Sequence, residues 1–210
     1  MYVPSAFRED DPDTLRAIIR NARLAQFVTA TATGPIATPL PMLLDPDEGE
    51  HGVLYGHLAK PNPQWQESVL GEALAIFMGA DAYISAGWYP SKLVNHKVVP
   101  TWDYEAVQAF GPVEFFSDAC RLLDVVTRLT DRHEAHQKTP WHVTDAPDSF
   151  IQGQLKGIVG LRLPITRLVG KRKMSQNRPT EDRAGVARGL AESSDPLDRA
   201  VAGMIPLDGK

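Results

Sequence analysis

Short extended runs separated by turn residues fill the chain from residue 25 to residue 116, and they constrain the fold more than any other feature. Residues 27–31, 36–44, 53–59 and 73–78 are rich in β-branched, aromatic or aliphatic side chains. Pro39 and Pro41 cannot donate ladder hydrogen bonds, so that run belongs at a sheet edge, a bulge or a bend. No helices alternate regularly with the runs, so the pattern predicts antiparallel strands in a closed or partly closed barrel.

Helical patterns flank this region. Asp11 and Pro12 suit a cap and a first helical position, and Leu15, Ile18 and Ile19 form one apolar stripe, which predicts a helix over residues 12–22. Further strands are expected at 82–86, 98–107 and 113–116, helices at 118–137 and 147–159, and an extended segment at 161–174. Residues 179–191 and 196–204 are helical but poor in large apolar side chains. We therefore expect a mainly β, α+β fold: a barrel domain over residues 1–175 and a helical extension over 176–210 that packs on the barrel or on a dimer partner.

The composition excludes several classes of protein. The 210 residues carry 22 Lys and Arg against 26 Asp and Glu, a formal charge of −4. Cys120 is the only cysteine, so an internal disulfide and a zinc cage of several thiolates are impossible. No run approaches the roughly 18 apolar residues that span a bilayer, and the N-terminus lacks the pattern of a secretory signal. These features predict a cytoplasmic protein without a membrane partner.

Positive charge is concentrated toward the C-terminus. From Arg162 to Arg188 there are eight Lys and Arg against two acidic residues, a net of +6 that leaves −10 for the remainder. A basic segment on an acidic body suits an anion, either a small phosphate or nucleic acid. A solvated strand and helix surface is the alternative. The candidate nucleic-acid contacts are Arg167, Lys171, Arg172 and Lys173.

Common catalytic and metal-binding motifs are missing. The sequence contains no Gly-x-Ser-x-Gly, no Gly-x-Gly-x-x-Gly and no Gly-x-x-x-x-Gly-Lys-Ser/Thr. The two histidines of His133-Glu134-Ala135-His136 are three positions apart, which differs from the zincin spacing, and no third ligand is evident. We therefore expect no metal site, and the spacing identifies no catalytic acid or base.

Three stretches combine aromatic rings with amides, hydroxyls and a lysine: residues 55–65, 83–92 and 97–104. They contain three of the four Trp and four of the five Tyr. A planar heteroaromatic phosphate ligand needs flat apolar faces, polar groups at the ring edges and a cation for the phosphate. The alternative is that these rings fill a small barrel.

The same stretches carry a family resemblance. Residues 1–4, 56–65, 82–92, 99–104 and 173–178, in this order, resemble the PaiB-type FMN-binding negative transcriptional regulators. The resemblance implies a split β-barrel of the pyridoxamine-phosphate-oxidase type, assembled as a homodimer with FMN at the subunit interface. It places His57, Lys60 and Asn62 at the phosphate, with Lys60 as the main charge partner, in place of the paired Arg-Lys clamp of the oxidases.

The resemblance also implies the remaining walls of the flavin site. Peptide groups from Met42 to Leu44 would face the edge of the flavin ring, and Gln176 and Asn177 would reach the site from the C-terminal strand of the same or the partner subunit. The other predicted contacts are Ser85, Trp88, Tyr89, Lys92, Thr101, Trp102 and Tyr104.

Three functions follow as hypotheses. The first is a homodimeric FMN-binding repressor of transcription, which contacts DNA directly or through another protein. The sequence shows no helix-turn-helix pattern, so only the basic segment supports direct contact. The second is an FMN-dependent oxidoreductase with an indirect regulatory role, since flavins carry redox chemistry. The third is a small-ligand module that has lost its flavin.

Overall fold

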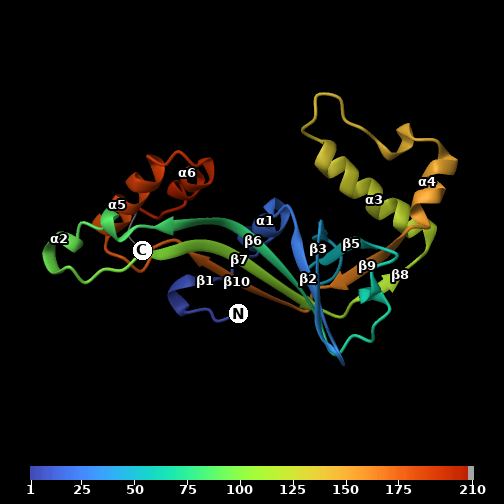
Figure 1. Cartoon of the computed structure of the whole chain (residues 1–210), viewed down its shortest axis with the longest axis horizontal. Helices are drawn as coiled ribbons and strands as arrows, with labels where there is room; N and C mark the ends of the chain where they lie inside the picture. The colour runs from blue at the N-terminus through green and yellow to red at the C-terminus, as the bar shows by residue number, and fades with distance from the viewer. Residues whose placement is uncertain (208–210) are drawn as a thin grey trace. The chain divides into compact units, whose positions relative to one another are not determined.

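The computed structural model describes residues 1–207 and arranges the strands in two sheets (Figure 1). The first sheet has the strand order β1-β10-β7-β6-β2-β3, and the second has the order β4-β5-β9-β8. The strands are β1 Arg8–Glu9, β2 Ala25–Thr31, β3 Gly34–Leu40, β4 Leu43–Asp45, β5 Val53–Ala59, β6 Ala73–Ile84, β7 Thr101–Gly111, β8 Glu114–Phe116, β9 Ile158–Pro164 and β10 Arg167–Lys173. Adjacent pairs such as β2–β3, β5–β9 and β8–β9 are antiparallel, as predicted.

Helices fill the intervals between these strands. The α-helices are α1 Pro12–Asn21, α2 Lys92–Asn95, α3 Ala119–Glu134, α4 Asp148–Leu155, α5 Thr180–Ala191 and α6 Pro196–Ala202, and the 3-10 turns are η1 Ser5–Phe7, η2 Pro63–Trp65, η3 Ala86–Trp88 and η4 Val143–Asp145. The predicted mixed α+β fold class is therefore confirmed. None of the helices between residues 1 and 207 combines the length and apolar character that crossing a bilayer requires.

The chain forms two compact units, each built from separate segments. Unit 1 comprises residues 1–21, 78–107 and 169–210, and unit 2 comprises residues 22–77 and 108–168. The long strands β6 and β7 contribute residues to both units. The predicted boundary at residue 175 falls inside the last segment of unit 1 and stays a prediction.

Unit 2 packs α3 against its strands. Asp118 caps this helix by accepting a hydrogen bond from the Arg121 backbone N–H at 2.9 Å. Leu122, Val125 and Leu129 follow at helical spacing and are buried with residues of β8 and α4. The amphipathic pattern of the sequence thus positions α3 over the strands that carry part of the predicted site.

Unit 1 buries the two C-terminal helices despite their few large apolar residues. Val186 and Leu190 of α5 join one core with Tyr89 and Met174. Close approach is possible because α5 presents glycines: a Cβ at Gly189 would lie 2.4 Å from the Trp88 ring. Glycines therefore allow α5 to pack closely even though it has few large apolar side chains. Both α5 and α6 pack within their own unit.

Three predicted strand boundaries were wrong. The run at residues 36–44 is divided between β3 and β4, which belong to different sheets. Residues 73–84 form one strand, β6, rather than two, because Gly79 is not a turn: a Cβ there would lie 2.8 Å from Glu105 Cβ, so the glycine permits close packing inside a strand. Residues 161–174 form the end of β9 and all of β10, separated at residues 165–166. The prediction for Pro39 is confirmed, because β3 lies at a sheet edge.

Candidate functional site

One buried glutamine holds the loop that follows β5. Gln64 is fully buried, and its Oε1 accepts a hydrogen bond from Thr38 Oγ1 at 2.6 Å. Its Nε2 donates to Thr29 Oγ1 at 3.1 Å and to the Ile36 carbonyl at 3.2 Å. Gln64 thus ties residues 60–65 to β2 and β3. This role was not predicted from the sequence, where the signal is a polar residue that follows the Asn-Pro cap of a turn.

The same loop leaves one cation free. Asn62 is committed to the loop, since its Oδ1 accepts from the Gln64 backbone N–H and its Nδ2 donates to Thr38 Oγ1. Trp65 Nε1 donates to the Lys60 carbonyl at 2.9 Å. The Lys60 side chain is exposed, and its ammonium has no polar partner among residues 1–207. Of the three predicted phosphate contacts, Lys60 therefore has the charge and accessibility that an anion needs.

His57 lies in a different environment. It lines an apolar pocket together with residues of α3 and α4. Its Nδ1 atom is buried and has no hydrogen-bond partner within the described chain. Burial lowers the pKa of His57 below its ordinary value, so the imidazole is neutral near pH 7. A neutral imidazole offers a hydrogen bond but no charge to a phosphate, and the predicted flavin contact of His57 stays a prediction.

The segment predicted to face the flavin edge leads into β4. Met42 is buried, and its carbonyl accepts a hydrogen bond from Arg132 Nη1 at 3.2 Å. Leu43 is paired with Tyr55 in the β4–β5 ladder. The backbone of Met42 and Leu43 is thus positioned by α3 and β5, and its contact with a flavin remains a prediction.

In unit 1, the predicted residues of β7 meet two lysines of β10. Lys171 Nζ donates to Tyr104 Oη at 2.6 Å and lies 4.9 Å from the centre of that ring. Lys173 Nζ donates to Thr101 Oγ1 at 2.8 Å and to the Trp102 carbonyl. The Trp102 side chain is 54% exposed. The structure therefore brings Thr101, Trp102 and Tyr104 together, and it adds two ammonium groups to them.

Lys171 is an unusual cation because it is buried without a carboxylate. It is only 9% exposed, and Tyr104 is its polar partner among the described residues. The neighbouring Lys173 differs, since it pairs with the buried Asp103 at 3.1 Å. A buried charge that lacks a counter-ion is costly. This position therefore suits an incoming anionic or electron-rich group.

An exposed aromatic residue that the sequence analysis did not select lies beside this set. Tyr83 of β6 is half-exposed, and its ring meets Trp102 edge-on at 6.0 Å between ring centres. The two ring planes are inclined by 70°, so the pair does not form one flat surface, but the half-exposed Trp102 ring offers a face on which a planar molecule can stack. Period-two alternation in residues 82–84 is the sequence signal that would have identified it.

Three other predicted contacts serve the structure of unit 1. Ser85 Oγ caps η3 by accepting from the Gly87 backbone N–H at 3.1 Å. Trp88 covers the glycines of α5, and Tyr89 is 1% exposed in the core. For Trp88 and Tyr89, the structure therefore agrees with the alternative that aromatic rings fill the interior.

The remaining predicted contacts of unit 1 differ in their surroundings: one is hydrogen-bonded within a turn, and two are exposed. Gln176 Oε1 accepts from the Met174 backbone N–H at 2.6 Å, so this amide stabilises the turn after β10. Lys92 and Asn177 are exposed. The flavin contacts of all three stay predictions.

Two of the four predicted nucleic-acid residues are neutralised within the chain. Arg172 Nε forms an ion pair with Glu105 Oε1 at 2.8 Å, and Lys173 pairs with Asp103 as described above. Lys171 has no acidic partner among the described residues, but it is buried. Arg167 lies with its guanidinium 3.6 Å from the centre of the Phe110 ring and is exposed. Of the four, Arg167 therefore presents an exposed cation without an acidic partner in the described chain.

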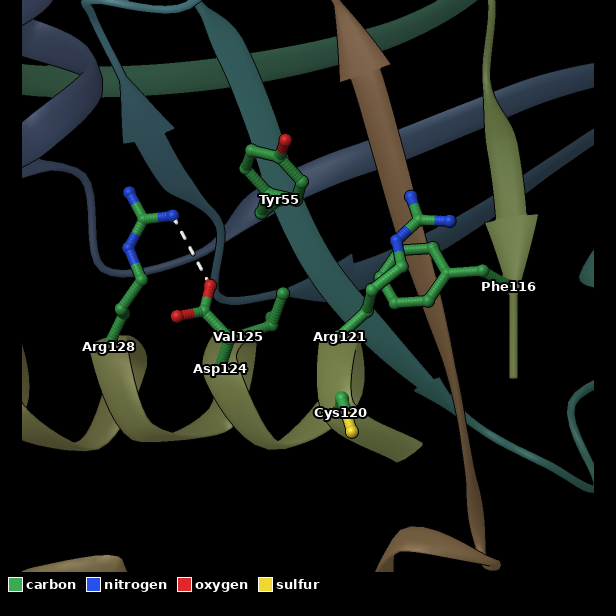
Figure 2. Close-up of a pocket in the computed structure, with 7 residues that line it drawn as sticks. All are labelled: Tyr55, Phe116, Cys120, Arg121, Asp124, Val125 and Arg128. Atoms are coloured by element: carbon green, nitrogen blue, oxygen red, sulfur yellow. Dashed lines mark ion pairs between the residues drawn. The ribbon is translucent and has the colours of Figure 1, made fainter. Parts of the chain in front are cut away.

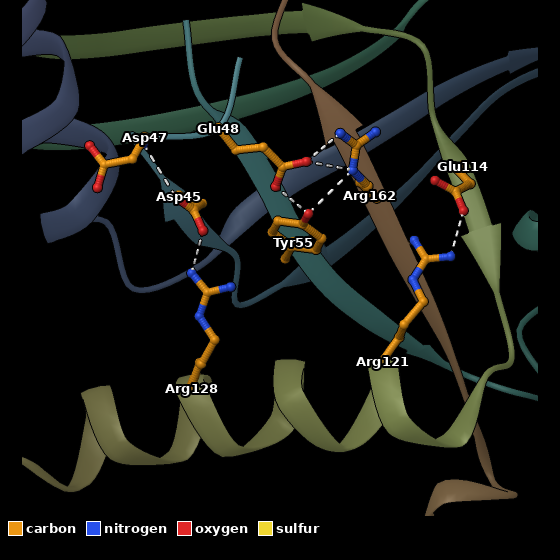
Figure 3. A network of polar contacts seen from close by, with 8 residues as sticks. All are labelled: Asp45, Asp47, Glu48, Tyr55, Glu114, Arg121, Arg128 and Arg162. Carbon is orange, nitrogen blue, oxygen red and sulfur yellow. Dashed lines mark hydrogen bonds and ion pairs between the residues drawn. The ribbon is translucent and has the colours of Figure 1, made fainter.

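Unit 2 also contains an arginine-rich pocket that the sequence analysis missed. It has a volume of about 300 Å³ and lies between α3 and the strands, as Figure 2 shows. Arg121 and Arg128 are seven positions apart on one face of α3, which is the signal that could have located it. Arg128 pairs with Asp45 at 2.8 Å, and Arg121 pairs with Glu114 at 2.7 Å (Figure 3).

Tyr55 joins this network to β9. Its hydroxyl donates to Glu48 and accepts from Arg162 Nε at 3.2 Å (Figure 3). The hydrogen bond from Tyr55, followed by that from Arg162, holds the pKa of Glu48 below its ordinary value. Burial, followed by the bond to Glu48, raises the pKa of Tyr55. Each arginine has a carboxylate partner, so the network stabilises unit 2 rather than attracting an anion.

Each unit, taken by itself, offers groups that suit a part of FMN. Unit 1 offers an exposed aromatic pair and the buried Lys171 ammonium, which suit a planar ring with electron-rich edges. Unit 2 offers the exposed Lys60 ammonium, which suits a phosphate. Among residues 1–207, no three His, Cys, Asp or Glu side chains could jointly hold a metal ion.

Comparison with known proteins agrees with this fit. A family model described as "Putative FMN-binding domain" matches residues 1–167. The protease synthase and sporulation protein PAI 2 of Bacillus subtilis is 28% identical over 98% of this chain and 96% of its own length. The uncharacterized protein AN0679 of Emericella nidulans is 30% identical over 100% of this chain and 98% of its own.

A solved structure supports the fold. The flavocytochrome Anf3 of Azotobacter vinelandii superposes with a TM-score of 0.58 at 15% identity, covering 80% of this chain and 69% of its own. The split-barrel fold predicted from the motifs is thereby confirmed. The chain belongs to the family of FMN-binding domains, and FMN is its cofactor.

Proposed function

We propose that the protein is a homodimeric FMN-dependent oxidoreductase whose effect on transcription is indirect. One observation carries this choice over direct repression: Arg172 and Lys173 are paired with Glu105 and Asp103 of the same unit, and Lys171 is buried against Tyr104. Nucleic-acid binding depends on cations that remain available to phosphates. Because these three cations are not available to DNA phosphates, we favour a function based on the redox chemistry of the flavin.

Each unit would offer its own contacts to the cofactor. In unit 2, Lys60 would bind a phosphate group. In unit 1, Trp102 with Tyr83 would offer ring faces for stacking, and Lys171 would offer positive charge to an electron-rich group. When bound, FMN supplies the acceptance and donation of a hydride or of single electrons, while the protein supplies position and electrostatics.

A second copy of the chain would cover apolar surface that is exposed in one copy. Leu93 and Val94 of α2 are each 83% exposed, and Trp102 and Tyr83 are half-exposed. Exposed large apolar side chains that gather on a surface often mark an interaction site. Analytical ultracentrifugation of the FMN-loaded protein should therefore show a dimer, and a monomer at micromolar concentration would contradict this part of the proposal.

One experiment tests the oxidoreductase assignment, and a second tests the contact with the cofactor's phosphate. Anaerobic mixing of the FMN-loaded protein with reduced nicotinamide should bleach the visible flavin absorbance, and re-aeration should restore it. An unchanged spectrum with both nicotinamides would refute the assignment without refuting FMN binding.

The second experiment concerns the cofactor's phosphate. Lys60→Met should weaken FMN binding about tenfold or more and leave riboflavin binding nearly unchanged, because riboflavin has no phosphate. Lys156→Met, at another exposed lysine of unit 2, is the control. Equal losses for FMN and riboflavin would show that Lys60 does not contact the phosphate.

Direct repression is the second candidate function. The Bacillus subtilis relative is named for protease synthase and sporulation, and the exposed Arg167 could contact a phosphate. A mobility-shift series at increasing salt would then retard promoter DNA at low salt, and Arg167→Ala would reduce the salt dependence. No retardation at any salt concentration would remove this candidate.

A further inference from the structure

Unit 2 contains a second pocket, bounded by residues of β5, α3, η4 and α4. Its volume is about 260 Å³, and it shares no lining residue with the pocket in Figure 2. Val126, Ile151 and Leu155 form part of an apolar wall, and the lining contains no Asp, Glu, Lys or Arg. Trp141 and Phe150, also in the lining, are 47% and 57% exposed. The pocket is therefore apolar, uncharged and partly open.

One residue of this lining, His57, carries a buried polar atom that lacks a partner. Its Nδ1 atom is almost fully covered and makes no hydrogen bond within the described chain. Nearly all buried polar groups in folded proteins are hydrogen-bonded, so an unsatisfied one calls for an explanation. Leaving it without a partner costs free energy that a ligand with a complementary group would recover.

We propose that this pocket binds a small uncharged ring that bears a hydroxyl group, a phenol in chemical class. A cavity of roughly 150 Å³ already accommodates benzene, so 260 Å³ accepts one substituted ring. A hydroxyl both donates and accepts, so it satisfies Nδ1 in either tautomer of a neutral imidazole. The absence of charged side chains from the lining selects against ionised ligands.

The test compares phenol with toluene, which has the same shape but no hydroxyl. Both are titrated into the FMN-loaded protein and followed in ¹⁵N-correlated NMR spectra by the indole signal of Trp141, assigned with Trp141→Phe. We expect phenol to bind about tenfold more tightly than toluene, with the Trp141 signal shifting at the same concentration. If phenol does not bind, or if the two compounds bind equally well, the proposal is wrong, and this comparison needs only the unmutated protein.

His57→Phe should abolish the preference for phenol while toluene still binds, and His136→Phe, at an exposed histidine of the same unit, should leave the preference intact. A preference that survives His57→Phe would also overturn the proposal.

Competition between phenol and FMN decides whether the pocket is separate from the flavin site. If FMN-free protein binds phenol and saturation with FMN removes that binding, the pocket belongs to the flavin site and the proposed separate ligand is wrong. The outcome does not depend on whether the flavin reacts with nicotinamide.

Discussion

The Gln64→Met substitution tests whether one amide organises the loop after β5. It removes the hydrogen bond accepted from Thr38 and those that the two amide N–H groups donate to the acceptors of Thr29, Ile36 and Phe27, about three full hydrogen bonds in all, while keeping the length of the side chain. Each bond contributes about 1 kcal/mol net, which predicts a loss of about 3 kcal/mol in the free energy of unfolding. That is a large share of the roughly 5–15 kcal/mol typical of a folded domain.

Urea denaturation measures this loss. The midpoint should fall while the slope of the free energy against urea stays constant, because the surface exposed on unfolding does not change. Gln66→Met, at an exposed neighbour in the same loop, should change the free energy of unfolding by less than about 0.5 kcal/mol. A loss below about 1 kcal/mol for Gln64→Met would refute the argument that its hydrogen bonds hold the loop.

Three further substitutions have directions set by the structure. Gly189→Ala in α5 should destabilise by about 1–3 kcal/mol in thermal unfolding, although alanine favours helices, because the new Cβ meets the Trp88 ring at 2.4 Å; a stabilised variant would contradict this packing. Tyr104→Phe should cost about 1–3 kcal/mol in chemical denaturation by leaving the Lys171 ammonium without its partner, and an unchanged midpoint would show that the lysine finds another. The lowered folded pKa of Glu48 contributes stability above the unfolded value of about 4.3 that is lost as pH falls through the folded value. Denaturation between pH 7 and pH 3 should therefore show a weaker pH dependence for Glu48→Gln, and identical profiles would contradict this contribution.

Local pattern alone determined much of the fold. The helix at residues 12–21, the amphipathic α3 and the edge position of Pro39 follow from periodicity and from the missing donor of proline. Such signals depend on neighbours within a few positions, so they can be read before the chain is folded. The motif order likewise identified the FMN-binding family, because several collinear matches are more specific than any single one.

The tertiary structure decided which polar groups remain available. Lys171 and Lys173 look like a surface charge run in the sequence, yet their partners Tyr104 and Asp103 lie about seventy positions earlier. The orphaned Nδ1 of His57 likewise depends on helices far along the chain. Hydrogen-bond partners are selected by strand order and packing, which spacing does not encode. A sequence can therefore indicate that a flavin belongs to the chain, whereas only the folded arrangement shows which cations and rings are free to meet it.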